Sequence, residues 1–207
     1  MLANWTEFQI TWYEDVVEEC YVYVVAGPSG VGKSALSYQL ARYLQTPIVE
    51  VDDLFLAVEA LTSPEEHPIL HYWRENPEAA NDLSPESILG IHLEVCRSLA
   101  PAIVSVIDNH IETRLPIVLE GDYILPELLK KYSNHVVGFF IVVDEQEKIV
   151  ENFLNREPLK GRQQKRAQVS ALFGRWLRNE CASLGCGIFA PRPWGTQFDR
   201  AIRLIKS

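Results

Sequence analysis

The segment 27–34 combines residue types and spacing that suit phosphate binding. It has the sequence Gly-Pro-Ser-Gly-Val-Gly-Lys-Ser, and it lies between the apolar run 21–26 and an amphipathic stretch. Glycines let successive backbone N–H groups point inward at an anion, and a helix that follows adds its positive N-terminal end. Lys33 supplies a cation for the outer phosphates, and Ser34 supplies an oxygen ligand for Mg²⁺. The sequence therefore predicts a site for ATP and Mg²⁺, lined by Gly27, Pro28, Ser29, Gly30, Val31, Gly32, Lys33, Ser34 and Ala35.

Phosphoryl transfer from such a nucleotide also needs a carboxylate near the acceptor hydroxyl. Asp52 follows the apolar segment 48–51, and we predict that it orients or deprotonates that hydroxyl. Its neighbour Asp53 is assigned to Mg²⁺. Either aspartate alternatively caps the next helix, because aspartate is favoured at helix starts.

A second acidic pair, Glu120 and Asp122, follows the apolar segment 116–119. Glu120 is predicted to hold Mg²⁺ or its water ligands together with Ser34, in the manner of the acid at the end of the third strand of phosphate-loop enzymes. Asp122 is assigned, with Asp52, to the acceptor. The alternative is a turn in which Gly121 adopts a left-handed conformation, which accounts for the glycine but not for both acids.

Basic residues concentrate in the segment 155–166. Arginines on a mobile helical hairpin can close over a triphosphate, exclude water and stabilise the migrating charge. The sequence predicts such a lid at about 155–167, with Arg156 and Arg162 ahead of Lys160 and Arg166 as phosphate contacts. Alternatively, these side chains are solvated and offset the helix dipole.

Five apolar segments alternate with helical patterns and must position these residues. They are 21–26, 48–51, 116–119, 136–143 and 187–190. The alternation predicts an α/β fold of three layers, a five-stranded parallel sheet with helices on both faces. Ligands of such sheets bind at the carboxyl ends of the strands, where the phosphate loop and both acidic pairs fall.

Composition limits the classes of partner. The chain has 207 residues, 47% hydrophobic and 23% charged, which suits one domain over 1–207. Its formal net charge of −9 argues against nucleic acid, because phosphate backbones require a basic surface. No apolar run approaches the roughly 20 residues of a membrane span, and Met1–Trp5 lacks the start of a secretory signal. We therefore expect a cytoplasmic protein without a membrane partner.

The phosphate loop follows the first predicted strand, acidic residues follow the second and third, and a basic segment comes after the fourth. With this order, the sequence resembles small P-loop kinases of the nucleoside-monophosphate-kinase-like group. The step 51–52, Val-Asp, is similar to the strand-two aspartate of chloramphenicol-phosphotransferase-like and shikimate-kinase-like enzymes, which serves the acceptor hydroxyl. The segments 118–121 and 124–126 resemble the corresponding stretch of 2-phosphoglycerate kinases. The resemblance implies a lid after the fourth strand and a base-contacting loop after the fifth, where Arg192 and Trp194 flank adenine. Trp194 is alternatively a core aromatic.

The acceptor is the least defined part of this prediction. No arginine pair typical of nucleoside-monophosphate binding lies between the second and third strands, and no Asn-Lys-x-Asp motif for reading guanine is present. The proline-broken excursion 54–81 is predicted to form the acceptor pocket, with His71 and Arg74 contributing to specificity. Packing of a surface excursion is the alternative.

The sequence thus predicts a kinase, monomeric or homodimeric, that transfers phosphate from ATP to a hydroxyl of a small molecule. The rival hypothesis is a regulatory ATPase module that binds nucleotide and has no acceptor. Asp52 favours the kinase, because a regulatory switch needs no base for an acceptor hydroxyl.

Overall fold

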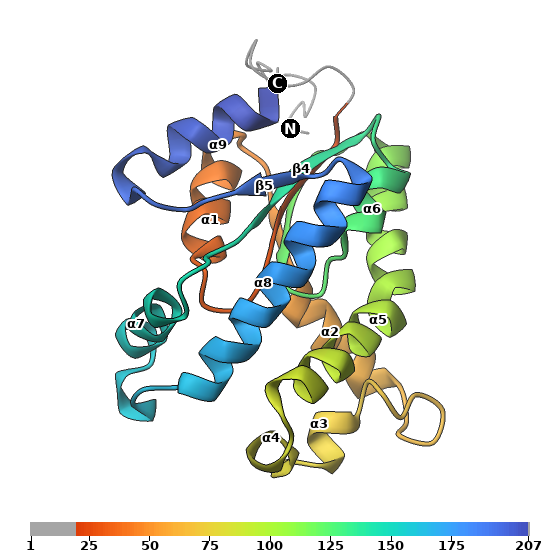
Figure 1. Cartoon of the computed structure of the whole chain (residues 1–207). Helices are drawn as coiled ribbons and strands as arrows, with labels where there is room; N and C mark the ends of the chain where they lie inside the picture. Colours follow the sequence, from red (N-terminus) through yellow and green to blue (C-terminus); the bar gives the residue numbers. More distant parts are fainter. Residues whose placement is uncertain (1–19, 207) are drawn as a thin grey trace, which may run out of the picture.

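Five parallel strands form one sheet at the centre of the fold (Figure 1). The computed structural model describes residues 20–206, so the expectation drawn from Met1–Trp5 lies outside the described residues. The strands follow the order β2-β3-β1-β4-β5, and each neighbouring pair is parallel. They are β1 (Val22–Ala26), β2 (Ile48–Glu50), β3 (Ile117–Gly121), β4 (Val136–Ile141) and β5 (Gly187–Phe189). The predicted α/β class and five-stranded parallel sheet are confirmed.

Alternate residues of the central strands face opposite sides of the sheet and build two buried clusters. Val24 and Leu119 belong to the first cluster, and Val25 and Phe139 belong to the second. The first face is covered by α2 (Val51–Leu61), α5 (Pro85–Thr113), α6 (Pro126–Lys131) and α8 (Gln164–Leu184). The second is covered by α1 (Lys33–Tyr43), α7 (Gln146–Arg156) and α9 (Gln197–Lys206).

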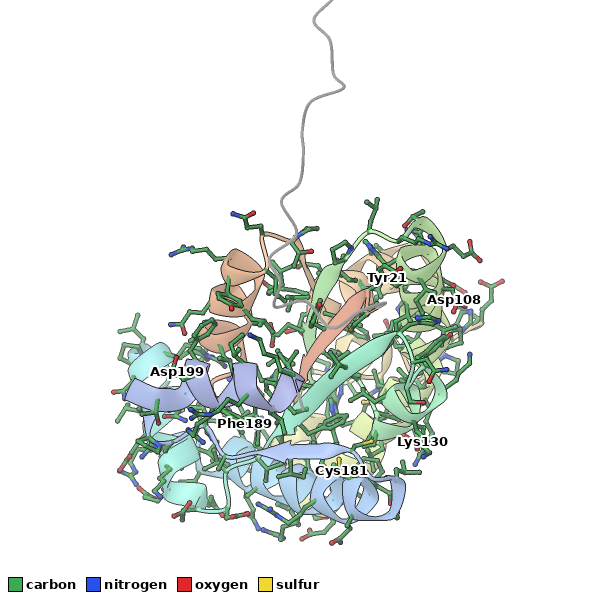
Figure 2. The ribbon with its side chains drawn as sticks, turned by 90° about the horizontal axis from the view of Figure 1, so that it is seen from above. Tyr21, Asp108, Lys130, Cys181, Phe189 and Asp199 are labelled. Atoms are coloured by element: carbon green, nitrogen blue, oxygen red, sulfur yellow. The ribbon has the colours of Figure 1, made fainter. Side chains whose placement is uncertain are left out.

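The view from above shows the two helical layers directly (Figure 2). The helix α8, labelled at Cys181, and the helix α9, labelled at Asp199, lie on opposite sides of β5, labelled at Phe189. This arrangement confirms the predicted helices on both faces of the sheet.

The carboxyl ends of the parallel strands meet at one end of the molecule, the lower end in Figure 1. The loop between β1 and α1 turns there, and α2 leads from β2 into the excursion with α3 (Tyr72–Glu75) and α4 (Ala79–Asp82). The lid segment lies at the same end, where α7 is followed by the short helix η1 (Pro158–Lys160) and the start of α8. After β5 the chain forms the single turn η2 (Trp194–Thr196) before α9.

The second strand is shorter than the sequence predicts. The strand β2 ends at Glu50, and Val51 begins α2 instead of closing the strand. Val51 is completely buried and packs on Gly121, where an added Cβ would lie 2.7 Å from the Cβ of Val51. The glycine is therefore needed for this close approach, and the alternative of a left-handed turn at Gly121 is wrong, since that residue ends β3 without a positive φ.

The long helix α5 begins at Pro85, where the Ser84 hydroxyl caps it by accepting a hydrogen bond from the backbone N–H of Ser87 at 3.1 Å. By length and composition alone this helix could cross a membrane, although the sequence shows no uninterrupted apolar run. It lies along the sheet, and Leu99, Ile103 and Ile107 are buried in the first core cluster. These contacts are those of a core helix.

Candidate active site

Lys33 and Ser34 converge on Glu120 at the centre of the candidate site. The Lys33 ammonium donates to the carbonyl oxygen of Pro28 at 3.1 Å, and its Nζ lies 3.8 Å from Oε1 of Glu120. The Ser34 hydroxyl donates to Oε2 of Glu120 at 3.4 Å. Lys33 and Glu120 are both buried, with 8% and 5% of their surface exposed. The end of β3 thus provides the carboxylate that stands beside the phosphate loop, as the sequence predicts.

The phosphate loop enters α1 through a glycine with a positive φ. Gly32, the residue before this helix, has a φ of 93°, a conformation that side-chain-bearing residues rarely adopt. An added Cβ would also lie 2.7 Å from the ring of Trp194. The N-terminal N–H groups of α1 carry no side-chain cap and no acid lies in the first turn, so the positive end of the helix remains for an anion.

The oxygen donors around Ser34 fit a Mg²⁺ ion bound beside phosphate groups. Within residues 20–206, no group of three or more His, Cys, Asp or Glu side chains is arranged to hold a metal ion. Mg²⁺ in phosphate-transferring sites is commonly bound by one or two protein oxygens, with phosphate and water completing the octahedron. The Ser34 hydroxyl and the Glu120 carboxylate supply such oxygens. Asp53 is exposed in the first turn of α2, and its assignment to Mg²⁺ stays a prediction.

Asp52 and Asp122 form a pair of carboxyl groups beside this centre. Asp52 lies in the first turn of α2 and is a solvent-exposed residue. The pKa of Asp52 is raised from 3.8 to about 6, chiefly because protein atoms around the carboxyl remove part of its hydration. The charge of Asp122 adds to this shift, while Lys33 opposes it. A hydrogen bond with the Asp122 side chain also favours the protonated form. A carboxyl group with a pKa near neutrality is suited to accept a proton from a hydroxyl.

The pKa of Glu120 is also raised. It moves from 4.5 to about 7, chiefly because the carboxyl is buried; Lys33 opposes the shift, and the nearby charges of Asp52, Glu50 and Asp122 add to it. A carboxyl whose pKa is higher in the folded than in the unfolded chain stabilises the fold when it is protonated. Ionisation of Glu120 therefore lowers the free energy of unfolding of the protein.

We expect the nucleotide-free protein to become more stable as the pH falls from 8 to about 5.5. Protonation of Glu120 near pH 7 and of Asp52 near pH 6 favours the folded state, and the gain should be about 1–3 kcal/mol in the free energy of unfolding. Urea denaturation at several pH values measures this quantity. Glu120→Gln should remove most of the pH dependence, whereas Glu112→Gln, an exposed residue of α5, should leave it unchanged. Equal pH dependence in wild type and Glu120→Gln would contradict the assignment.

The segment after β5 reaches the phosphate loop. The ring of Trp194 lies against Gly32 and is 44% exposed, so it is not the core aromatic of the alternative interpretation. Arg192 donates to the Asn152 side-chain oxygen at 3.4 Å, and the Asn152 amide in turn donates to the carbonyl of Gly30 at 2.8 Å. Within the described part of the chain, the buried Nε of Arg192 has no hydrogen-bond partner. The Nε–H of Arg192 is therefore available as a hydrogen-bond donor. The contact of Arg192 with adenine stays a prediction.

The lid arginines differ in their partners. Arg162 pairs with Glu147 of α7, and both side chains are more than half exposed. Arg156 pairs with Glu157 at 2.7 Å. Arg166 was predicted to rank behind Arg156 and Arg162 as a phosphate contact. Among the described lid residues, it is the basic residue that reaches the phosphate loop, donating to the hydroxyl of Ser29 at 3.2 Å. Neighbouring Lys165 donates to the backbone carbonyl of Asn81 at 2.8 Å and so joins the start of α8 to the end of α4.

The two predicted acceptor residues have partners within the excursion. His71 is buried, and its Nε2 lies 3.0 Å from the hydroxyl of Thr62. Arg74 forms an ion pair with the buried carboxylate of Glu59 at 2.6 Å. The charges of Asp122, Asp52 and Glu59 all contribute to raising the pKa of Tyr123. The Arg74–Glu59 pair is thus placed on the Asp52 side of the fold, and its role in acceptor binding stays a prediction.

The fold and the loop together resemble those of small P-loop kinases. No protein-family model matches the chain. Among solved structures, a gluconokinase from Sinorhizobium meliloti 1021 aligns with a TM-score of 0.51 and 16% identity, over 90% of this chain and 92% of that one. A sugar kinase from Janibacter sp. HTCC2649 aligns with a TM-score of 0.51 and 19% identity, over 89% of this chain and 94% of that one.

A curated protein adds a likeness in sequence. A 2-phosphoglycerate kinase from Methanococcus maripaludis strain C6 is 24% identical over 168 residues, which cover 75% of this chain and 53% of that protein. The chain therefore spans about half the length of the curated relative it matches. The predicted resemblance to small P-loop kinases, including the 2-phosphoglycerate kinases, is confirmed.

Three residues that contact the loop or its arginine were missed by sequence reasoning. They are Asn152, Phe153 and Glu157, which lie on or directly after α7. All three fall on ordinary helical or turn positions outside any motif, so only the packing of α7 against the phosphate loop identifies them. The sequence offers one signal: Asn152 and Phe153 lie directly before the predicted lid, and Glu157 lies within it.

Proposed function

We propose that this protein transfers the γ-phosphoryl group of ATP to a hydroxyl group of a small molecule. The observation that carries the proposal is the Asp52–Asp122 pair, which lies within electrostatic reach of Lys33 and Glu120. Burial of the Asp52 carboxyl and the charge of Asp122 together raise the pKa of Asp52 to about 6. A nucleotide-binding switch has no use for such a base, because it has no acceptor hydroxyl to orient.

Each residue has a part in this reaction. The backbone of the loop and the Lys33 ammonium bind the β- and γ-phosphates, and Arg166 approaches the same loop from the lid side. The Asp52 carboxylate accepts the proton of the acceptor hydroxyl, whose oxygen then bonds to the γ-phosphorus as the bond to the β–γ bridging oxygen breaks. Ser34 and Glu120 would hold Mg²⁺, which would supply positive charge to neutralise the phosphates. Positioning and electrostatics therefore account for catalysis here, without a covalent intermediate.

The acceptor class is narrowed by the relatives and by the local charge. The curated relative is named a 2-phosphoglycerate kinase, and two solved structures of the same fold are named gluconokinase and sugar kinase. Hydroxy acids, their phosphate esters, sugars and sugar acids are therefore the first acceptors to test. Arg74 is the cation of the excursion placed to meet an anionic acceptor, although it must then share its charge with Glu59.

The test is a panel assay with purified protein, ATP and Mg²⁺. We expect ADP to form faster in the presence of members of one acceptor class, with a phosphoester product visible by phosphorus NMR. The acceptor-free rate of ATP hydrolysis is the control. ATP binding and hydrolysis that no acceptor accelerates would favour the regulatory ATPase instead.

A further inference from the structure

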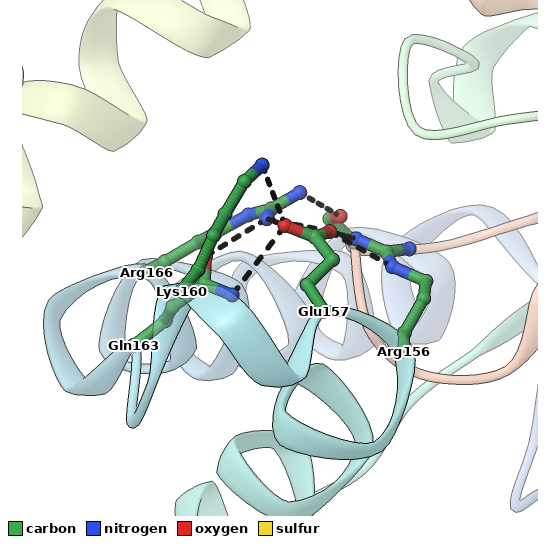
Figure 3. Close-up of polar contacts among 6 residues, drawn as sticks. Arg156, Glu157, Lys160, Gln163 and Arg166 are labelled. Atoms are coloured by element: carbon green, nitrogen blue, oxygen red, sulfur yellow. Dashed lines mark hydrogen bonds and ion pairs between the residues drawn. The ribbon is translucent and has the colours of Figure 1, made fainter.

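The carboxylate of Glu157, in the predicted lid, forms ion pairs with three basic side chains (Figure 3). Oε1 of Glu157 accepts hydrogen bonds from Arg156 at 2.7 and 3.0 Å, and Oε2 lies 2.7 Å from the Lys160 ammonium. Nη1 of Arg166 donates to both oxygens, at 3.1 and 3.2 Å. The bonds from Lys160 and Arg156 lower the pKa of Glu157 to about 2, so the carboxylate is ionised at any pH at which the protein would work.

The guanidinium of Arg166 is anchored through one terminal nitrogen and contacts the phosphate loop through the other. Nη1 binds Glu157 and the side-chain oxygen of Gln163, whereas Nη2 donates to the hydroxyl of Ser29. The guanidinium plane lies over the ring of Phe153, with its central carbon 4.3 Å from the ring centroid. Phe153 is completely buried and packs against Gly30 of the loop. The anchored edge fixes the orientation of the group, because a guanidinium is rigid and planar.

This network differs from an ordinary surface ion pair. The pair Arg162–Glu147 on the same hairpin joins one exposed cation to one exposed anion, and such pairs contribute little. The Glu157 side chain is only 18% exposed and faces three cations, of which Arg166 also contacts the loop. Like charges brought this close repel one another unless an anion lies between them. Without Glu157, Arg166 would lose both its anchor and the charge that offsets its neighbours.

We propose that Glu157 is a positioning residue that holds Arg166 against the phosphate loop, so that the free donors of the guanidinium meet the terminal phosphates of the nucleotide. The inference rests on the proposed use of ATP but is independent of which acceptor is phosphorylated. Glu157 contacts no substrate; it acts through Arg166. Its effect should therefore disappear when Arg166 is absent.

The test measures binding of a non-hydrolysable ATP analogue with Mg²⁺ by titration calorimetry, with no acceptor added. Arg166→Ala should weaken binding by about tenfold, as expected for loss of a charge-assisted hydrogen bond. Glu157→Gln should weaken it by about three- to tenfold, because the amide keeps the volume but cannot hold the guanidinium. The double variant should match Arg166→Ala within about twofold, since the two residues act as one unit.

The matched control is Asp144→Asn. It breaks an exposed ion pair of 2.7 Å between Asp144 and Arg178, and it should leave the dissociation constant unchanged. Thermal unfolding of every variant shows whether the fold is retained. The readout is binding, so a wild-type protein that does not bind the analogue would reject the proposed function itself.

Other outcomes reject the positioning role alone. If wild type binds and Glu157→Gln binds equally well, Glu157 does not orient Arg166. Tighter binding by Glu157→Gln would show that the carboxylate competes with the nucleotide for the lid cations. Losses that add in the double variant would show that Glu157 and Arg166 act separately.

Discussion

Lys33→Ala is expected to lower the rate of ATP turnover by about a hundred- to a thousandfold, the loss typical of removing one preorganised charge from a transition state. The ammonium of Lys33 is buried, and the neighbouring Pro28 carbonyl and Glu120 carboxylate hold it in the loop. Among residues 20–206, Lys33 is the basic residue that pairs with Glu120. A coupled assay of ADP formation measures the effect.

The fold should survive this substitution, because the Lys33 ammonium faces the loop and not the apolar core. Removal of the cation that lowers the pKa of Glu120 should also leave that carboxyl more protonated at neutral pH. Lys148→Ala, which removes an exposed cation of α7, is the control and should retain full turnover. Wild-type turnover in Lys33→Ala would remove this loop from the catalytic site.

Asp52→Asn is expected to lower phosphoryl transfer to the acceptor by about a hundred- to ten-thousandfold, the usual contribution of a general base. Binding of ATP should change little, because the proposed role of Asp52 is at the acceptor hydroxyl and not at the nucleotide. In the wild type, the rate should fall as the pH drops below about 6, since protonation of Asp52 near its pKa of about 6 removes the base. Steady-state rates between pH 5 and 8 measure this acidic limb, which the variant should lack.

Asp53→Asn separates the two neighbouring aspartates. The same change of charge one residue away leaves the Asp52–Asp122 pair intact, so the acidic limb should remain. Loss of that limb in Asp53→Asn and its retention in Asp52→Asn would transfer the role of base to Asp53. Loss of ATP binding in Asp52→Asn would place that residue in the nucleotide site instead.

The strands and the loop were predictable because their signals are local. The buried run Val22–Ala26 is apolar on both faces, as a central parallel strand requires, and the glycines and Lys33 follow it directly. Glu120 and Asp52 were placed together correctly, because strand ends of a parallel sheet share one edge. The end of β2 was predicted one residue too late, since only the contact of Val51 with Gly121 decides it.

The ranking of the lid arginines could not be obtained from sequence. Arg156, Arg162 and Arg166 are chemically identical and lie within a few positions of one another. They differ in the direction in which the folded chain orients their side chains. Arg166 contacts Ser29, whereas Arg162 pairs with Glu147. The partner of Arg74, a glutamate one helix away, likewise depends on how the excursion folds back on α2.

The hydrogen bond from Lys165 to Asn81 spans 84 positions of the chain and joins the helix that carries Arg166 to the excursion that carries Arg74. A shift of α8 toward bound nucleotide must therefore either move the end of α4 or break this bond. If filling the proposed acceptor pocket also shifts α4, the two sites are coupled through this bond. The acceptor would then change the affinity for ATP by the same factor as ATP changes the affinity for the acceptor.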